Sequence, residues 1–263
     1  MDIARRKTSC EKHRCFGGGK PDTVRSHGSG RSAAWLARLF RVQEVVSSNL
    51  TAPTIFPIPT YDLKTSPAVP PSLLVELTSI TEHLQPGRIF PKPQPLEVEL
   101  GCGDASLTVA YAALHPERNF LGVERLLGRL VKLDKKGRRL GLTNLRGLRI
   151  ESAYLLEWLL PPQSVSVLHV YFPDPWPKKK HRRHRLINER FPALAHQVLQ
   201  PLGKVFLRTD DADYFGQMGE VFAADKRFQP SNTPAELAAV MTDFEKDFNA
   251  AGIPTLRAAY QRD

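Results

Sequence analysis

The chain has few cysteines and no long apolar run. Only three of its 263 residues are cysteines, at positions 10, 15 and 102. Their number and spacing do not suit a disulfide framework, so we expect a reducing, cytoplasmic environment. No apolar run approaches the roughly 20 residues of a membrane-spanning helix. The N-terminus also lacks the apolar core of a secretory signal. We therefore predict no membrane partner.

Metal ligands are also scarce. Cys10, His13 and Cys15 lie close together in the sequence, but no second ligand pair lies nearby to complete a four-ligand site. The sequence therefore predicts no metal cofactor.

Positive charge is abundant but local. The net charge is +10, and residues 1–60 hold ten Lys and Arg against four Asp and Glu. Residues 178–190 hold seven cations against one acid, so the rest of the chain is slightly acidic. Such a confined cationic segment is typical of a surface that binds a polyanion.

Composition divides the chain into three parts. Residues 1–55 are rich in Gly, Ser and Arg without a sustained period, which predicts a disordered leader. Residues 41–54 resemble the translation of the 3′ half of a tRNA gene, so we hypothesise that the leader reflects a mis-assigned start codon. An organelle transit peptide is the weaker alternative. Residues 56–94 read as a Pro-rich linker and a first helix, and residues 95–263 as the main domain.

Strands and helices alternate regularly from residue 96. We predict strands over 96–100, 119–124, 145–150, 165–172 and 204–209. We predict helices over 105–114, 126–140, 153–160, 183–199 and 212–224. This alternation indicates an α/β, doubly wound, mostly parallel sheet of the Rossmann-like kind. Residues 255–261 would add a final edge strand.

A glycine loop follows the first predicted strand of this domain. Gly101 and Gly103 would let the backbone approach a ligand at a helix N-terminus. A dinucleotide fingerprint requires a third glycine, where this chain has Ser106. Glu99 would repel a pyrophosphate but accept a cationic amino-acid group, and Glu124 suits the two hydroxyls of a ribose. The set favours S-adenosylmethionine over a dinucleotide, the alternative being a tight strand–helix turn.

Acidic residues also end the next three predicted strands. They are Glu151, Asp174 and Asp210. Because the carboxyl ends of parallel strands lie at one edge of a sheet, we expect these acids to line the same rim as Glu99 and Glu124. Glu151 could hold an adenine amino group, although an exposed strand-end acid explains it nearly as well.

Residues 172–181 read Phe-Pro-Asp-Pro-Trp-Pro-Lys-Lys-Lys-His. Prolines on both sides of Asp174 stiffen the loop that presents it. An acid, the ring of Trp176 and a cationic cluster together suit chemistry on a nucleic-acid base. The alternative is a Pro-rich turn before a solvated basic helix. For Trp176 we favour packing under the loop over stacking on a base.

Five motifs together resemble those of bacterial tRNA (guanine-N7-)-methyltransferases, over residues 95–263. They are residues 99–103, 120–124, 172–181, 209–210 and 242–245. The resemblance implies a class I methyltransferase that transfers a methyl group from S-adenosylmethionine to N7 of a guanine in the variable loop of tRNA. The chain departs from the family pattern in Glu151-Ser152-Ala153, where Asp-Ala is usual, and in Asp243 within the last motif.

The resemblance also implies residue roles. Asp174 would be the catalytic acid residue, and its charge would follow the positive charge that develops on the purine. The residues expected around the cofactor are Glu99, Gly101, Gly103, Glu124, Glu151 and Asp174. The residues expected to hold tRNA are Lys178, Asp210, Thr242, Asp243, Phe244 and Glu245. Either Asp210 or Glu245 would recognise the guanine, and cations 178–185 would neutralise phosphates.

Two other functions remain open from the sequence. The first is a class I methyltransferase that acts on another RNA, a small molecule or a protein. The second is a non-enzymatic RNA-binding protein on a decayed methyltransferase fold. The acids along the expected rim disfavour the second, because a binder of polyanions would gain by losing them.

Overall fold

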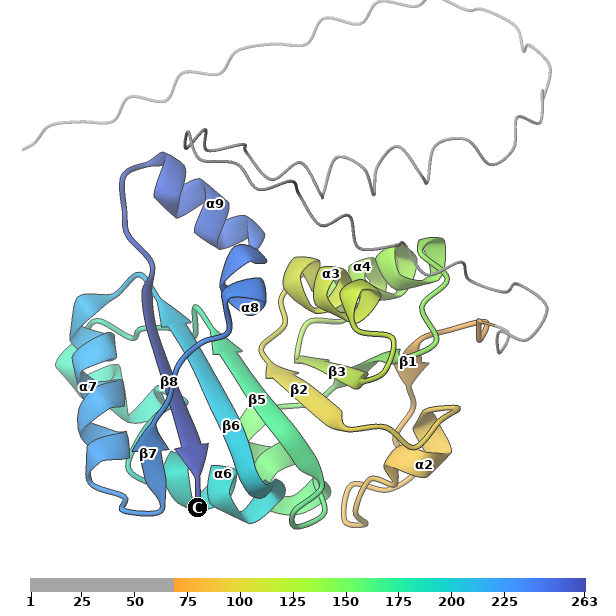
Figure 1. The fold of residues 1–263 in the computed structure, drawn as a ribbon, viewed down its shortest axis with the longest axis horizontal. Helices are drawn as coiled ribbons and strands as arrows, with labels where there is room; N and C mark the ends of the chain where they lie inside the picture. Colours follow the sequence, from red (N-terminus) through yellow and green to blue (C-terminus); the bar gives the residue numbers. More distant parts are fainter. Residues whose placement is uncertain (1–68) are drawn as a thin grey trace, which may run out of the picture. The chain divides into compact units, whose positions relative to one another are not determined.

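A computed structural model describes residues 69–263, which form an eight-stranded, mostly parallel sheet (Figure 1). The strand order is β1-β4-β3-β2-β5-β6-β8-β7, and only the pairings of β8 are antiparallel. The strands are β1 (Leu74–Val75), β2 (Leu96–Leu100), β3 (Asn119–Glu124), β4 (Leu145–Arg149), β5 (Val165–Tyr171), β6 (Leu199–Thr209), β7 (Phe228–Pro230) and β8 (Leu256–Arg262). The predicted leader and the Cys10, His13 and Cys15 cluster lie outside the described residues.

Helices cover both faces of the sheet (Figure 1). The α-helices are α2 (Pro86–Ile89), α3 (Ser106–Leu114), α4 (Leu127–Arg139), α5 (Ser152–Tyr154), α6 (Phe191–Val198), α7 (Ala212–Ala223), α8 (Ala235–Ala239) and α9 (Asp243–Ala250). A π-helical turn, η1 (Leu155–Leu159), follows α5, and a 3-10 helix, η2 (Lys179–His184), follows β5. Side chains of α3, α4 and α8 pack in one core layer, and those of η1, α6 and α7 pack in the other. The predicted doubly wound fold is therefore confirmed.

The central strands are buried on both faces, because helices cover the sheet on either side. Every residue of β2 and of β3 is buried. The parallel strands β2 to β6 all end at one edge, and Figure 1 places α8 and α9 above the ends of β5 and β6. This edge is the rim on which the sequence placed its acids.

Several elements differ from the sequence prediction, two of them near the cationic segment and the sheet edge. The helix expected over 183–199 begins only at Phe191, with Pro192 in its first turn, where a missing N–H costs nothing. Before it, the chain turns because the side chain of Asn188 donates to the carbonyl of Arg185 at 3.0 Å. The strand expected at the edge, β8, lies between β6 and β7, because the unpredicted β7 pairs with its outer side.

Residues 69–94 belong to the same body and add more than a linker and a helix. β1 pairs with β4, and Leu73, Leu84 and Phe90 are buried in the core. Gly137 on α4 makes room for this segment, because a Cβ there would lie 2.5 Å from Leu73. The core therefore begins before residue 95.

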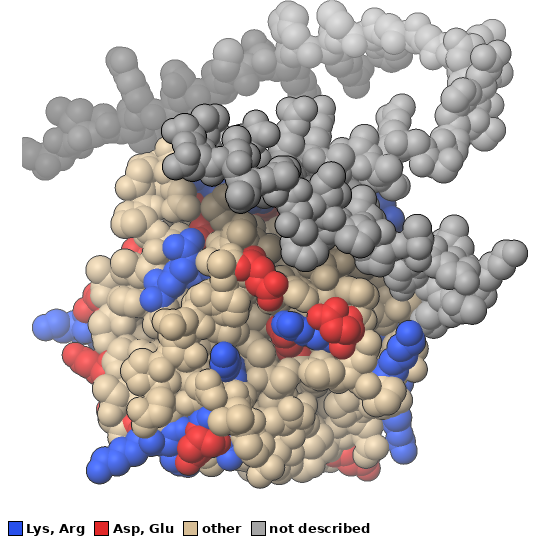
Figure 2. Space-filling view, in the orientation of Figure 1, with Lys and Arg blue, Asp and Glu red and all other residues tan. Residues whose placement is uncertain are grey.

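Charged side chains of both signs are scattered over the face in Figure 2, without a large area of one sign. This agrees with the sequence count, which places the surplus of cations in residues 1–60 and 178–190. Within residues 69–263, no helix combines the length and apolar character needed to cross a membrane.

Candidate functional site

The glycine loop between β2 and α3 has a left-handed backbone. Gly101 has a φ of 79° and Gly103 a φ of 55°, a region that favours glycine. The N–H groups of Gly101 and Cys102 donate to the carbonyl of Val123 at 2.9 and 2.8 Å, which ties the loop to β3. A Cβ added at Gly101 would meet nothing within 4 Å. The loop therefore borders open space in which a ligand can approach the backbone.

Glu99 lies buried beneath this loop, with only 4% of its surface exposed. Burial raises the pKa of its carboxyl to about 7, although the hydroxyl of Thr108 donates to the carboxylate and opposes the rise. A buried carboxylate resists ionisation because it loses its hydration. Glu99 is therefore close to changing charge at neutral pH, and a cationic ligand would favour its ionised form.

Glu124 ends β3 and is 8% exposed. Its Oε1 accepts from the N–H groups of Arg125 at 2.7 Å and Leu126 at 3.0 Å. Its Oε2 accepts from the half-exposed Arg129 at 3.2 Å. The backbone therefore fixes one oxygen, and the other faces a side chain that can move aside for a ligand hydroxyl.

Glu151 follows β4 and is exposed. Its carboxylate accepts from the N–H groups of Ala153 at 3.0 Å and Tyr154 at 2.7 Å, so it caps the short helix α5. Capping accounts for an acid at this position. A contact between Glu151 and adenine stays a prediction.

The loop that carries Asp174, residues 172–177, is the strained part of the rim. Phe172 has a φ of 49° and Trp176 a φ of 44°, which is uncommon for residues other than glycine. Asp174 between them is exposed, and no hydrogen bond or ion pair with another described residue involves its carboxylate. Backbone strain of this kind concentrates at functional sites.

Trp176 lies against two histidines of η2 and remains 36% exposed. Its ring centroid lies 5.9 Å from that of His181 and 5.2 Å from that of His184. The ring therefore packs against η2 while part of it faces solvent, and the choice between packing under the loop and stacking on a base stays a prediction.

The cationic segment is less uniform than its sequence suggests. Lys178, Lys179 and Lys180 are exposed and free to meet a phosphate. Arg185, which we expected among the phosphate-neutralising cations, is 1% exposed. That expectation is wrong for Arg185, because its guanidinium is bonded inside the protein and cannot reach a phosphate.

The segment Thr242–Glu245 comes together with the glycine loop, although more than 130 residues separate them. The N–H of Asp243 donates to the hydroxyl of Ser106 at 3.2 Å. Phe244 is 52% exposed and is the nearest neighbour of a Cβ placed on Gly103, at 4.0 Å. Thr242 caps α9 by accepting from the N–H of Glu245 at 3.0 Å.

An open pocket of about 240 Å³ lies where α9 faces the glycine loop and α4. It is lined by Asp104, Arg129, Lys132, Asp243, Phe244 and Asp247.

Asp210, also predicted to hold tRNA, is half-buried and directly follows β6. In the described part of the chain, no group of three or more His, Cys, Asp or Glu side chains is arranged to hold a metal ion.

Glu245, which we expected among the residues that hold tRNA, lies inside the protein in this structure. It is completely buried, and its Oε2 accepts from Arg208 at 2.7 Å while its Oε1 accepts from Arg257. Both carboxylate oxygens are thus engaged by arginines, so Glu245 anchors α9, and its contact with a guanine stays a prediction. The sequence did not indicate this, because the partners lie 37 and 12 residues away.

Arg208 was not predicted as part of the site. It donates to the carbonyls of Leu237 at 2.6 Å and Val240 at 2.7 Å as well as to Glu245. Its guanidinium also lies 4.6 Å from the ring centre of Tyr171, the last residue before the Asp174 loop. Arg208 therefore connects β5 and β6 to the arm formed by residues 235–250. The sequence signal that could have identified Arg208 is the presence of an arginine within the apolar run of β6.

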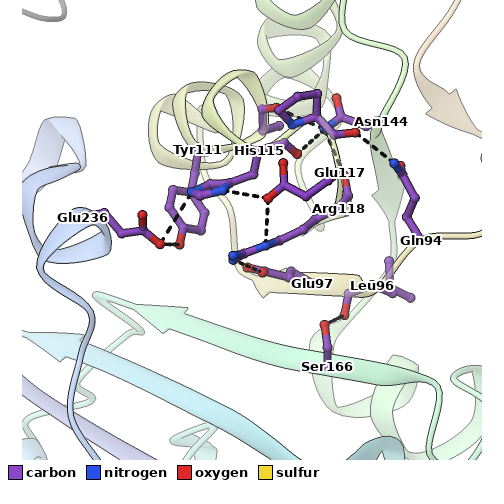
Figure 3. A network of polar contacts seen from close by, with 12 residues as sticks. Gln94, Leu96, Glu97, Tyr111, His115, Glu117, Arg118, Asn144, Ser166 and Glu236 are labelled. Carbon is purple, nitrogen blue, oxygen red and sulfur yellow. Dashed lines mark hydrogen bonds and ion pairs between the residues drawn. The ribbon is translucent and has the colours of Figure 1, made fainter. Parts of the chain in front are cut away.

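A network of polar contacts connects the arm of residues 235–250 to α3 and β2 (Figure 3). Tyr111 on α3 and His115, which follows α3, point toward Glu236 on α8, with atoms 3.5 and 3.8 Å apart. Arg118 bonds Glu97 at 2.9 Å, and His169 bonds the other oxygen of Glu97 at 2.8 Å.

Glu97 remains ionised within this network. Its burial would raise its pKa, but the bonds from His169 and Arg118 outweigh that effect and lower the pKa. The buried charge of Glu97 is thus compensated, and β2, β5 and α3 are held in one arrangement below the rim.

Comparison with known proteins identifies the family. A family model described as "Putative methyltransferase" matches residues 93–258. A tRNA (guanine-N(7)-)-methyltransferase of Nocardioides sp. is 35% identical over 175 residues, which cover 66% of this chain and 70% of that protein. One of Syntrophotalea carbinolica is 40% identical over 126 residues, covering 48% and 54%.

The match does not extend over the full length of every relative. The chain spans 54% to 66% of several curated relatives that it matches. Among solved structures, the 16S rRNA methyltransferase KamB is 15% identical with a TM-score of 0.49, covering 67% of this chain and 92% of that one. That likeness is too loose to bear on function. The family match and the curated relatives agree with the resemblance of the five motifs, and the chain belongs to the tRNA (guanine-N(7)-)-methyltransferase family.

Proposed function

We propose that this protein transfers the methyl group of S-adenosylmethionine to N7 of a guanine in the variable loop of tRNA, forming N7-methylguanosine. The observation that carries the proposal is the position of Asp174. Its carboxylate is exposed and unpaired, it lies at the rim in a strained loop, and exposed lysines follow it directly. Membership of the family supports the same assignment.

The residues of the glycine loop fit S-adenosylmethionine. Gly101 borders open space, and the acid beneath it, Glu99, would meet the cationic amino-acid part of the cofactor. Glu124 would use its Oε2 for a ribose hydroxyl. The cofactor, when bound, supplies an electrophilic methyl group on its sulfonium.

The chemistry demands position more than proton transfer. N7 of guanine carries an in-plane lone pair and no proton, so it attacks a methyl group without a general base. Alignment of the reacting atoms then supplies most of the rate. Asp174 would stabilise the positive charge that the purine acquires, because its carboxylate has no competing partner.

Substrate contacts would come from both sides of the rim. Lys178 to Lys180 would neutralise phosphates, which makes tRNA binding sensitive to salt. Phe244 offers an exposed ring on which a base can stack. Because Glu245 is engaged by two arginines, Asp210 is the better placed of the two acids to accept the guanine N1–H and amino group.

The direct test uses the full chain, methyl-labelled S-adenosylmethionine and bulk tRNA from a strain that lacks N7-methylguanosine. We expect label in tRNA that ribonuclease removes and that chromatography of the nucleosides identifies as N7-methylguanosine. Label in protein, in a small molecule or in another nucleoside would contradict the proposed substrate.

Cofactor binding should depend on pH through Glu99. Because a cationic ligand requires the ionised form, we expect affinity to rise by about tenfold per pH unit up to about pH 7 and then level off. Calorimetry at a series of pH values measures this, and Glu99→Gln should flatten the profile. The same profile in both proteins would exclude Glu99 as the titrating group.

Stability of the cofactor-free protein should change in the opposite direction. The folded-state pKa of Glu99, about 7, lies above its ordinary value of 4.5, so the folded state holds the proton more tightly. The stability that Glu99 contributes is fully present below pH 4.5 and is lost as pH rises through about 7. Thermal unfolding of the wild type and of Glu99→Gln at several pH values isolates this contribution.

A further inference from the structure

Arg185 has an unusual environment for a residue in a cationic surface segment. Its side chain is completely buried and belongs to the largest fully buried side chains of the described residues. Its Nε donates to the carbonyl of Pro175 at 2.6 Å, directly after Asp174. This contact joins a buried guanidinium to the loop that presents the exposed acid.

The Asp174 loop is held at its start, where the N–H of Phe172 donates to the carbonyl of Arg208 at 2.8 Å, and by the ring of Trp176 on η2, but its backbone has little support over residues 173–177. Within residues 69–263, the bond from Arg185 is the only hydrogen bond that reaches residues 173–177. Three of those five residues are prolines, which have no N–H to donate. The loop also contains two residues with a left-handed backbone, Phe172 and Trp176. Strained backbone persists only where its surroundings hold it.

Helix α7 holds Arg185 itself. The Nη2 of Arg185 donates to Asp213 Oδ2 at 2.7 Å, and its Nη1 donates to Gln217 Oε1 at 2.7 Å. The guanidinium lies 4.6 Å from the ring centre of Tyr214. The bond from Arg185 lowers the pKa of Asp213, which therefore stays ionised. Each of the three guanidinium nitrogens donates to a protein group, and the side chain is buried, so Arg185 does not face a phosphate in this arrangement.

We propose that Arg185 is the positioning residue of Asp174. Because α7 holds its guanidinium in place, the bond from Arg185 to the carbonyl of Pro175 keeps the Asp174 carboxylate at the rim. Its planar fork reaches Pro175, Asp213 and Gln217 at once, which a lysine cannot do. The kinetic part of this inference rests on the proposed function, whereas the structural part does not.

The structural part is tested by fluorescence. In a background with Trp35→Phe and Trp158→Phe, Trp176 is the remaining tryptophan. Arg185→Lys should increase the quenching of Trp176 by acrylamide, because the loop loses the guanidinium that connects Pro175 to α7. Arg227→Lys makes the same change at a surface ion pair on Asp225 and should leave quenching unchanged. Unchanged quenching in Arg185→Lys would overturn the proposal.

The kinetic part is tested by methyl transfer to tRNA. Arg185→Lys should lower kcat by about 10- to 100-fold, because a small displacement of the acid misaligns the site, while KM for tRNA changes little. A rise in KM with kcat retained would instead assign Arg185 to tRNA binding and overturn the proposal. Should the wild type not methylate tRNA, the proposed function fails, and the quenching result still decides the role of Arg185.

Two further variants cover the case in which Arg185→Lys does not fold. Asp213→Asn and Gln217→Leu each remove one support and leave Arg185 in place. Each should increase the quenching of Trp176 and lower kcat, with a smaller effect than Arg185→Lys. Folded variants with the quenching and kcat of the parent would refute the inference.

Discussion

Replacing Asp174 by alanine should lower methyl transfer to tRNA by about 10²- to 10³-fold or more, as expected when a group that stabilises developing charge is removed. The affinity for tRNA should remain nearly intact, because the lysines after the loop are unchanged. Single-turnover transfer of labelled methyl groups and filter binding of tRNA measure the two effects. Turnover retained at the wild-type level would refute the role of Asp174.

The position of Asp174 allows a loss of activity to be distinguished from a loss of stability. Asp174 is exposed and its carboxylate bonds no described residue, so its loss should change the free energy of unfolding by only about 0.5 kcal/mol. Asp174→Asn keeps the shape but removes the charge, and most of the loss should appear in it as well. Glu220→Ala removes another exposed acid, on α7, and serves as the matched control.

Replacing Arg208 by methionine should lower the free energy of unfolding by about 3–5 kcal/mol, the range for breaking a buried ion pair from one side. The variant leaves the buried Glu245 without one of its two partners and removes two bonds to the arm of residues 235–250. Denaturation in urea measures the loss. Limited proteolysis should also cut the arm faster than in the wild type.

A double-mutant cycle separates the ion pair from other effects. Arg208→Met combined with Glu245→Gln should be more stable than Arg208→Met alone, because the uncompensated charge is gone. Arg257→Met removes the partly exposed partner and should cost less. A loss of less than about 1 kcal/mol in Arg208→Met would mean that Glu245 is held mainly by Arg257.

Two buried arginines thus organise the rim in parallel ways. Each lies 4.6 Å from the centre of a tyrosine ring, and each bonds a backbone carbonyl of a functional segment. Arg185 holds the Asp174 loop, and Arg208 holds the arm that carries Phe244. Neither contacts solvent enough to meet tRNA. Their charge contributes to the position of other residues rather than to binding.

Local patterns in the sequence sufficed for the parallel strands β2 to β6 and for the glycine loop, but not for the short parallel strand β1. Strand period, the glycines and the prolines act within a few residues, so they can be read along the chain. Because parallel strands end at the same edge of a sheet, the acids that follow them lie along that edge. The helix expected over 183–199 was misplaced, because η2 and the turn held by Asn188 precede Phe191, where the helix begins.

The fold class, the family and the position of Asp174 beside a cationic segment could be predicted from the amino-acid sequence alone. Which charged residues face solvent could be read only from the folded structure. Arg185 and Glu245 belong to motifs that suggest contact with tRNA, yet both are buried, and each pairs with an oppositely charged residue 28 or 37 residues away. Burial and charge pairing depend on which distant segments meet, so the position of a residue in a motif does not reveal them.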